Sequence, residues 1–302
     1  MINFQKRKTG LRVTKNKIVE QLRSLGVEKG DLLFVASDLM KVGYFNKNQI
    51  QTMTDWIDIF AELLGPAGTI IIPSYTDIFS RFARSSQTPF TPARYSNSGS
   101  LANAYIQFTE NHIRSPHPVY SCVAVGPLAE ELCSHTVEAK AYDPYAVVID
   151  NKGKNLMLGT IDEKNCPMPF HYAQQVLGHT KSHPLCGLFK ASYIDGSNRQ
   201  KDYIVREIGG CTRGVHKLWG RHLAKNAVQF GKVGRSLSGL VDASTSYHIM
   251  LDVLKNEPSE IKCSNKLCIS CYGRFRYNGY GVVGFYPQKF LHYTAQFLGA
   301  KK

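Results

Sequence analysis

The chain has 302 residues, enough for one large domain or two small ones whose buried core needs no disulfide or metal. Hydrophobic residues make up 43% and charged residues 20%, which is ordinary for a soluble globular enzyme. Lysine and arginine total 37 against 23 acidic residues, and this formal charge of +14 favours anionic partners and argues against a polycationic substrate.

The start of the chain, MINFQKRKTGLRV, has cations but lacks the apolar segment of a secretory signal. No stretch approaches the roughly 18 uninterrupted apolar residues that a membrane helix needs. We therefore expect a cytoplasmic protein with no membrane partner. In that compartment its eight cysteines are thiols or metal ligands rather than disulfides.

The first part of the chain alternates amphipathic helices with short apolar strands. Thr14 is placed to cap a helix that buries apolar residues at i, i+4 and i+7 and stops at Gly26. A strand at Asp31–Val35 follows, and then a helix from Ile50 that ends at Gly65. The next predicted elements are a strand at Thr69–Ile72, a helix at Leu101–Phe108, a strand at Ser121–Val125, a short helix from Leu128, a strand at Leu156–Leu158 and a helix at His171–Leu177.

The pattern changes near Leu185 to two strand-like segments, LFKASYI and KDYIVREI. A helix is predicted from about Leu240 to Leu254, and the Tyr-, Gly-, Arg- and Cys-rich stretch after it is irregular until about Val282. The alternation predicts an α/β fold, a layered sheet with helices on both faces. We expect a body at residues 1–255 and a cysteine-rich appendage at 256–302 that packs on it.

Two stretches carry candidate chemistry. The first is RSPHPVYSCVAVG at 114–126, a Pro-bracketed polar loop that enters a strand of small residues. The second is LMLGT at 156–160, followed by PFHYAQ at 169–174. Further pieces are GPAGT at 65–69, IPSYT at 72–76 and DPY at 143–145. The order and spacing of all the pieces is far more specific than any one of them.

Together these motifs resemble the aminoglycoside 3-N-acetyltransferase family, over about residues 15 to 255. The segment DLLFVAS at 31–37 is also similar to the first strand of that family. The resemblance implies an antibiotic-acetyltransferase-like fold and acyl transfer from a CoA thioester to a primary amine. Such a reaction needs a base for the amine proton and preorganised donors for the thioester oxygen.

The resemblance assigns the base to His171, at the N-terminus of a helix whose dipole disfavours the imidazolium. Ser37 is a candidate donor to the thioester oxygen or the CoA arm. The positions expected to line the CoA channel are His117, Ser121, Ser74 and Thr76.

This chain departs from the family at Gln174, where relatives usually place the glutamate that orients the histidine. A neutral amide can fix the ring by a hydrogen bond but cannot stabilise imidazolium by charge. Either Asp38, Asp77 or Asp162 replaces the missing carboxylate, or the base is less strongly activated. A second departure is Ala36, where many relatives have histidine. His179 and His183, in a loop-like segment, are expected to be structural.

Cys263, Cys268 and Cys271 form a C-x4-C-x2-C knuckle in the basic tail. Three thiolates at that spacing favour tetrahedral Zn(II). The alternative is an iron–sulfur cluster, which nothing else in the sequence requires. The fourth ligand is expected to be Cys211, with His216 as the alternative. The zinc would fasten an appendage that has little apolar area of its own. The remaining cysteines are expected to be small buried hydrophobes: Cys122, Cys133, Cys166 and Cys186.

The charge of +14 points to an acceptor that is itself anionic. We expect an amino sugar linked to a nucleotide, resembling the dTDP-3-amino-3,6-dideoxyhexoses used in surface-polysaccharide assembly, with an acetyl or a 3-hydroxybutanoyl group transferred from acyl-CoA. The residues expected to grip the nucleotide are Arg213, Lys217, Arg221, His222, Arg274 and Arg276, with Tyr272, Tyr277 and Tyr280. One alternative is a true aminoglycoside 3-N-acetyltransferase. The other is a zinc-knuckle protein that binds nucleic acid, although we expect no nucleic-acid partner.

Overall fold

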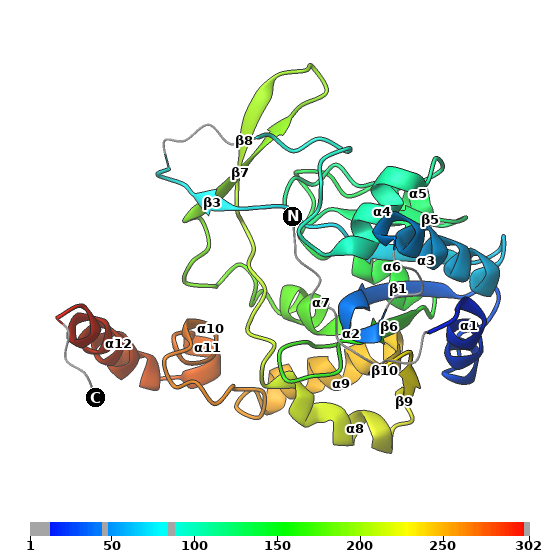
Figure 1. Cartoon of the computed structure of the whole chain (residues 1–302). Helices are drawn as coiled ribbons and strands as arrows, with labels where there is room; N and C mark the ends of the chain where they lie inside the picture. The colour runs from blue at the N-terminus through cyan, green and yellow to red at the C-terminus, as the bar shows by residue number, and fades with distance from the viewer. Residues whose placement is uncertain (1–12, 44–47, 84–87, 299–302) are drawn as a thin grey trace.

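A computed structural model describes residues 13–43, 48–83 and 88–298 of the chain (Figure 1). The strands within these ranges are β1 (Leu32–Ser37), β2 (Thr69–Pro73), β3 (Phe79–Ser80), β4 (Ile113–Arg114), β5 (Cys122–Val125), β6 (Lys154–Leu158), β7 (Phe189–Ile194), β8 (Gln200–Ile204), β9 (Val228–Val233) and β10 (Ser236–Asp242). The helices are α1 (Lys15–Ser24), α2 (Leu39–Val42), α3 (Gln49–Leu64), α4 (Ser100–Phe108), α5 (Ala129–Leu132), α6 (Pro144–Asp150), α7 (Pro169–Val176), α8 (Trp219–Ala224), α9 (Ala243–Asn256), α10 (Ile269–Tyr272), α11 (Phe275–Asn278) and α12 (Gly281–Phe297), with the 3-10 turn η1 at Val215–Leu218.

A seven-stranded sheet in the order β4-β5-β2-β1-β6-β10-β9 forms the centre of the molecule. Its three middle strands are parallel, because β1 pairs in parallel with both β2 and β6. The outer strands pair antiparallel with their neighbours. A separate sheet, β3-β7-β8, is antiparallel throughout. The carboxyl ends of the parallel strands therefore meet at one edge, where an open α/β sheet usually carries its site.

The core lies on both faces of the large sheet, as the alternation along β1 shows. Leu33 and Val35 belong to a cluster with the buried faces of α1, α3 and α4. Leu32 and Phe34 point to the other face and belong to a cluster with α5 and α6. Successive side chains of a strand point to opposite faces, so a strand covered on both sides is apolar at every position. The prediction of a mixed α/β fold with a layered sheet is confirmed.

The helix predicted from about Leu240 is wrong at its start. Leu240 and Val241 are the last apolar residues of β10, which pairs with β6 and β9, and the helix begins only at Ala243. Asp242 caps it by accepting a hydrogen bond from the Thr245 N–H at 2.7 Å. An apolar run that crosses from strand to helix has no change of composition at the boundary, so the capping aspartate is the only local signal.

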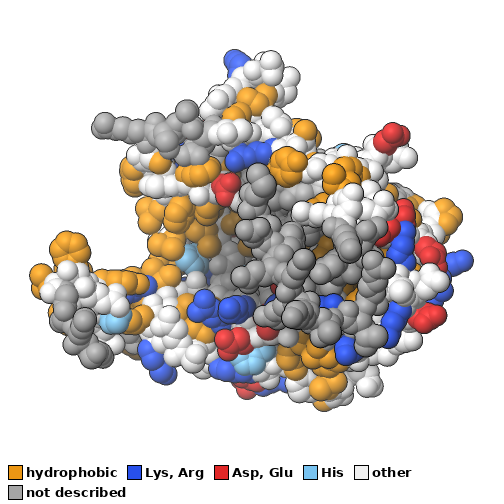
Figure 2. All heavy atoms as spheres, in the orientation of Figure 1, with side chains coloured by type: hydrophobic (Ala, Val, Ile, Leu, Met, Phe, Trp, Pro, Cys, Tyr) orange, Lys and Arg blue, Asp and Glu red, His pale blue; other side chains and the backbone are white. Residues whose placement is uncertain are grey.

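The cysteine-rich stretch is less irregular than expected, because it contains the four-residue helices α10 and α11 before α12 begins at Gly281. In Figure 1, α10, α11 and α12 project from one side of the body, and the sheet of β7 and β8 projects above them. Figure 2 shows the molecule hollowed between these two projections, with hydrophobic side chains along the hollow. Within the described ranges, no helix has both the length and the apolar character needed to cross a bilayer.

Candidate active site

Chemistry-bearing residues gather at the carboxyl edge of the parallel strands. Ser37 ends β1, Ser74 directly follows β2, and Gly159 directly follows β6. The loop after β6 leads to α7, whose start is tied to the sheet by a 2.7 Å hydrogen bond from the Met168 N–H to Asn155 Oδ1 in β6. His171 is the third residue of α7, as expected for a side chain at a helix N-terminus.

His171 is half-buried between aromatic and glycine neighbours. Its ring stacks on that of Tyr142, with centroids 5.2 Å apart and planes at 19°. Gly209 packs so closely that a Cβ there would lie 2.7 Å from His171 Nδ1 and 2.6 Å from the Tyr142 hydroxyl. Burial lowers the pKa of His171, and the positive charge of Arg274 lowers it further, against a raising effect of the hydrogen bond with Gln174. The imidazole is therefore held neutral.

Gln174 fixes which ring nitrogen of His171 carries the proton. Gln174 is fully buried, and its Oε1 lies 2.8 Å from the Gly210 N–H, which can only donate. The same oxygen lies 3.1 Å from His171 Nδ1, so Nδ1 must also donate. Gln174 Nε2 donates in turn to the Tyr277 hydroxyl at 2.7 Å. A neutral imidazole protonated at Nδ1 has its lone pair on Nε2, the state that a general base requires.

The carboxylates considered as substitutes for the missing glutamate are engaged elsewhere. Asp38 and Asp162 both pair with Lys41, at 3.5 and 2.9 Å, and Asp77 pairs with Arg94 at 3.6 Å. The tyrosine that stacks on His171 is instead flanked by carboxylates that our sequence reasoning missed.

The first of these is Glu207, whose side chain is buried and accepts hydrogen bonds from the Ala141 N–H at 2.7 Å and the Thr180 hydroxyl at 2.9 Å. The second is Asp143, which accepts from Gln175 Nε2 at 2.9 Å. Within the described residues neither has a Lys or Arg within ion-pair distance. The DPY motif was a signal for Asp143, whereas nothing local marked Glu207.

Two of the positions expected to line the CoA channel, Ser74 and Ser121, lie in a buried network around Arg114. Arg114 Nε donates to Ser74 Oγ and Ser121 Oγ, both at 3.2 Å, and its Nη2 donates to the Ser74 carbonyl at 2.8 Å. The Thr76 hydroxyl donates to the Pro118 carbonyl, and Thr76 is itself buried. The network joins the end of β2 to the loop before β5, so it shapes that loop, and contact with CoA stays a prediction.

His117 belongs to the same loop and is fully buried. Its Nδ1 accepts from the Val119 and Tyr120 N–H groups at 3.2 and 3.0 Å, so its proton is on Nε2. Burial, helped by the nearby His135, lowers the pKa of His117 to about 3. His117 is therefore a neutral ring that holds a turn, and its proposed contact with CoA remains untested.

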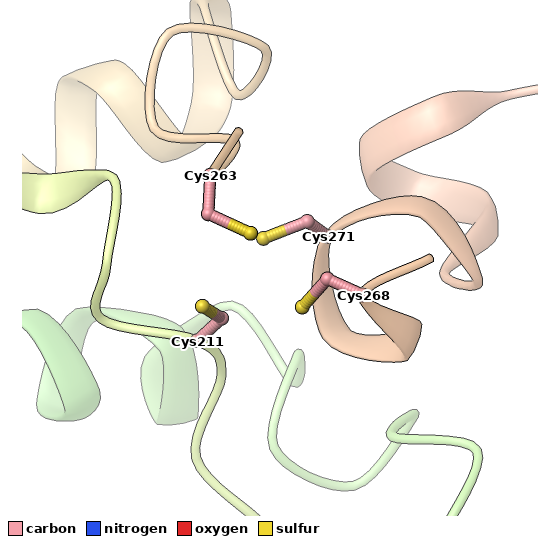
Figure 3. Close-up of side chains that lie close together, drawn as sticks. All are labelled: Cys211, Cys263, Cys268 and Cys271. Carbon is pink, nitrogen blue, oxygen red and sulfur yellow. The ribbon is translucent and has the colours of Figure 1, made fainter. Parts of the chain in front are cut away.

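The four cysteines of the predicted metal site converge. Figure 3 shows Cys211, on the loop after β8, facing Cys263, Cys268 and Cys271 of the tail. Their sulfur atoms all lie within 4.8 Å of one another. Sulfur atoms on a tetrahedron of Zn–S bonds are separated by roughly 3.8 Å, so the arrangement fits such a metal after a small contraction. The geometry groups Cys211, rather than the alternative His216, with the knuckle.

Comparison with known proteins identifies the class. The family model described as aminoglycoside 3-N-acetyltransferase matches residues 34–255. The chain therefore belongs to this family, an acetyltransferase family. Aminoglycoside N(3)-acetyltransferase III of Salmonella sp is 31% identical over 180 residues, which are 54% of this chain and 60% of that protein. The chain thus matches less than two thirds of the length of this relative.

Solved structures agree with the fold. That of apo aminoglycoside acetyltransferase AAC(3)-IVa has a TM-score of 0.71 at 22% identity and covers 90% of this chain and all of that one. The structure of AAC-IIIb with CoASH has a TM-score of 0.62 at 20% identity and covers 80% of this chain and 96% of that one. At these identities the likeness shows the fold alone.

The expected nucleotide-linked amino-sugar acceptor is wrong, because the family and the matching curated relatives are aminoglycoside acetyltransferases. The residues assigned to the nucleotide grip are mostly engaged by the protein itself. Arg221 pairs with Glu257 and Glu260 at 2.9 and 2.6 Å. The buried His222 contacts the Leu218 carbonyl and the Ser246 hydroxyl, at 2.8 and 3.0 Å.

Four further members of the predicted grip also contact the protein. Lys217 donates to the carbonyl of Lys262, and Arg276 to that of Leu177. Arg274 and Tyr277 are buried, 3% and 5% exposed. Six of the residues assigned to the grip therefore make contacts within the protein, whereas Arg213 and Tyr280 are exposed.

The formal charge of the chain is distributed unevenly along the sequence, so the total says little about the potential at the site. Of the formal +14, four charges lie in residues 1–12 and seven in residues 261–302, and neither segment contains an acidic residue. Residues 13–260 therefore carry only +3. Attraction of a substrate depends on the potential near its site, not on the net charge of the whole chain.

Proposed function

We propose that the protein transfers an acetyl group from acetyl-CoA to a primary amine of an aminoglycoside, with His171 as the general base. The observation that carries this proposal is the neutral, Nδ1-protonated imidazole set by Gln174 and Gly210. Membership of the aminoglycoside 3-N-acetyltransferase family supports the reaction class, and the CoASH bound to AAC-IIIb supports the acyl donor.

In this reaction His171 Nε2 takes a proton from the acceptor ammonium, and the free amine attacks the thioester carbon. The nitrogen of the tetrahedral intermediate loses its second proton as the C–S bond breaks, and the leaving CoA thiolate takes up one proton. The products are therefore an amide, CoASH and one proton, which His171 releases to solvent. The negative charge on the thioester oxygen needs preorganised donors. Ser37, at the end of β1 on the same sheet edge, stays our candidate for one of them.

A polycationic acceptor needs carboxylates near the base, and this site has them. Glu207 and Asp143 flank the Tyr142 segment and are held by neutral donors only, as far as the described residues go. Burial, helped by the charge of Glu207, raises the pKa of Tyr142, whose ring stacks on that of His171, whereas the pKa of His171 itself is lowered by burial and by the charge of Arg274. We infer that these two carboxylates attract the amines of the acceptor and offset the cation of Arg274 near the base.

The proposal is tested by incubating the purified protein with acetyl-CoA and a panel of aminoglycosides. We expect one thiol released for each amine acetylated, and mass spectrometry gives the number and position of the acetyl groups. His171→Asn should lower kcat by at least about a hundredfold, within the usual contribution of a general base of about 10²–10⁴. The matched control is His248→Asn, on the exposed face of α9. No acetylated product with any aminoglycoside, or full activity of His171→Asn, would refute the proposal.

We also propose that Cys211, Cys263, Cys268 and Cys271 hold a structural Zn(II) that fastens the appendage at 256–302 to the body. Support comes from the convergence of the four sulfurs and from the preference of Zn(II) for four thiolates in closed sites. We expect metal analysis of the protein to give one zinc per chain, and Cys268→Ser to weaken its retention. Cys186→Ser, outside the group, is the control. Iron with a visible absorption band would indicate a cluster instead, and no metal would refute the site.

A further inference from the structure

The amide of Gln174 is locked by groups on two separate segments. Its Oε1 accepts from the Gly210 N–H at 2.8 Å, and its Nε2 donates to the Tyr277 hydroxyl at 2.7 Å. If this amide turned by 180°, Nε2 would take the place of Oε1. Two donors, Nε2 and the Gly210 N–H, would then face each other, and Nε2 would also point at His171 Nδ1. His171 would then need its proton on Nε2, and the lone pair of the base would be lost.

Both locking segments are fastened at the cysteine cluster. Gly210 immediately precedes Cys211, and Tyr277 lies six residues after Cys271. The two segments also fit closely against the body and each other. A Cβ at Gly210 would lie 2.2 Å from Gln174 Nε2, and a Cβ at Gly214 would lie 1.9 Å from the carbonyl of Ile261, where the tail begins.

Besides the cysteine cluster, the tail is held by a small apolar contact, in which Ile261 and Tyr277 pack with body residues such as Phe170, and by a few hydrogen bonds to body carbonyls, such as those from Arg274 and Arg276. α10 and α11 have four residues each, too short for stability without packing. In α12 only Phe285 is buried, whereas large apolar side chains such as Phe290 and Leu291 are more than 60% exposed. Tyr277 itself is buried, with its ring against Arg274 (5.4 Å) and His179 (5.2 Å). Tyr277 lies six residues after Cys271, so closure of the cysteine cluster adds to this packing in fixing where its hydroxyl lies.

We propose that Tyr277 is a positioning residue for the catalytic base and that metal at the four cysteines controls its placement. The inference rests on the proposed function in taking His171 as the base and the four cysteines as a metal site. Loss of the metal frees the loop that carries Gly210 and the tail that carries Tyr277 together. The amide of Gln174 then rotates, and the protonated nitrogen of His171 changes. The metal site thus acts on the reaction without touching either substrate.

The first test is a tautomer measurement that needs no substrate. Long-range ¹H–¹⁵N NMR of histidine-labelled, zinc-loaded protein, assigned with His171→Asn, reports which nitrogen of His171 is protonated. We expect Nδ1–H in the wild type and a mixture with Nε2–H in Tyr277→Phe and after zinc removal by a chelator. Re-addition of Zn(II) should restore the first state. Tyr280→Phe, whose ring is 88% exposed on the same tail, should behave as wild type.

The second test separates positioning from binding. Tyr277→Phe should lower kcat by about three- to tenfold, the effect of one hydrogen bond, and leave KM for acetyl-CoA unchanged. Zinc removal should lower kcat further in the wild type than in Gln174→Ala, where there is no amide to misplace. Far-UV circular dichroism shows that the body stays folded in each sample.

The outcomes distinguish this inference from the proposed function. An unchanged tautomer in both Tyr277→Phe and the zinc-free protein would overturn the inference, whatever the enzyme acetylates. A changed tautomer in a protein that acetylates no aminoglycoside would uphold the positioning and refute the function. If the protein contains no metal and takes up no Zn(II), the proposed control of the Tyr277 position by metal is overturned.

Discussion

Gln174→Glu restores the glutamate that the resemblance leads one to expect and so tests the base directly. The new carboxylate would lie about 3 Å from His171 Nδ1, where Gln174 Oε1 is now. The Gly210 N–H and the imidazole N–H would donate to it, and the Tyr277 hydroxyl, which now accepts, can turn to donate. The buried charge is therefore compensated by three hydrogen bonds, and the variant should fold.

The magnitude follows from the charge at that distance. At an effective dielectric constant of about 20, two unit charges 4 Å apart interact by about 4 kcal/mol, and a neighbouring opposite charge commonly moves a pKa by about 1–3 pH units. A carboxylate stabilises the imidazolium, so the pKa of His171 rises from its lowered value. Because the base must be unprotonated, the acid limb of the kcat/KM profile should move upward by about 1–3 pH units.

The assay is thiol release from acetyl-CoA with one aminoglycoside across the pH range, with thermal unfolding of each variant measured in parallel. Val176→Glu places a carboxylate on the same helix at an exposed position and should leave the limb where it is. A shift of less than about 0.3 pH unit in Gln174→Glu, well below the effect of a contacting charge, would show that His171 is not the group that limits activity at low pH.

Three further predictions follow from packing and burial. Gly209→Ala should lower kcat at least about tenfold, because its Cβ would collide with the base and the tyrosine stacked on it, while Gly196→Ala, with open space around it, should not. Arg114→Ala should destabilise the fold by about 2–4 kcal/mol in urea unfolding, because it strands buried acceptors, and Arg199→Ala, largely exposed, is its control. Burial lowers the pKa of His117 to about 3 in the folded protein, so on acidification this histidine is protonated at a higher pH in the unfolded chain than in the folded one. The free energy of unfolding should therefore fall as the pH drops from about 6 to about 4, by up to about 1.4 kcal/mol per pH unit. A urea midpoint that stays constant over that range would contradict this prediction.

Much of the fold could be predicted from the sequence because its signals are local. Thr14 and Gly65 mark the beginning of α1 and the end of α3, and both boundaries are confirmed. The parallel strands are short apolar runs between helices, as a sheet covered on both faces requires. The hairpin of β9 and β10 was missed because apolar and polar residues alternate only weakly along its strands. The glycine of its turn, Gly234, is required by a close contact with a distant segment. A Cβ at Gly234 would lie 2.3 Å from the Val42 carbonyl.

The candidate site was predictable where one motif carried it and unpredictable where distant segments meet. His171 and the cysteine knuckle are each marked by local spacing, and the structure places them as expected. Glu207 was not marked and Tyr277 was assigned to the nucleotide grip instead, since their contacts near His171 arise only when the loop after β8 and the tail close over α7. The contacts that join Gln174 to Tyr277 span 103 residues, beyond the reach of any spacing rule.

The substitution of Gln174 for a glutamate acquires a physical reason once the tail is in place. A carboxylate at this position would accept hydrogen bonds on both oxygens, whereas the amide of Gln174 can also donate, and Tyr277 receives that donated bond. Arg274 lies beside the same tyrosine ring and lowers the pKa of His171 through its charge. With a cation already on the tail, a neutral partner keeps the imidazole unprotonated without a second buried charge. One cation of the basic tail, Arg274, therefore acts with burial to keep the proposed base unprotonated.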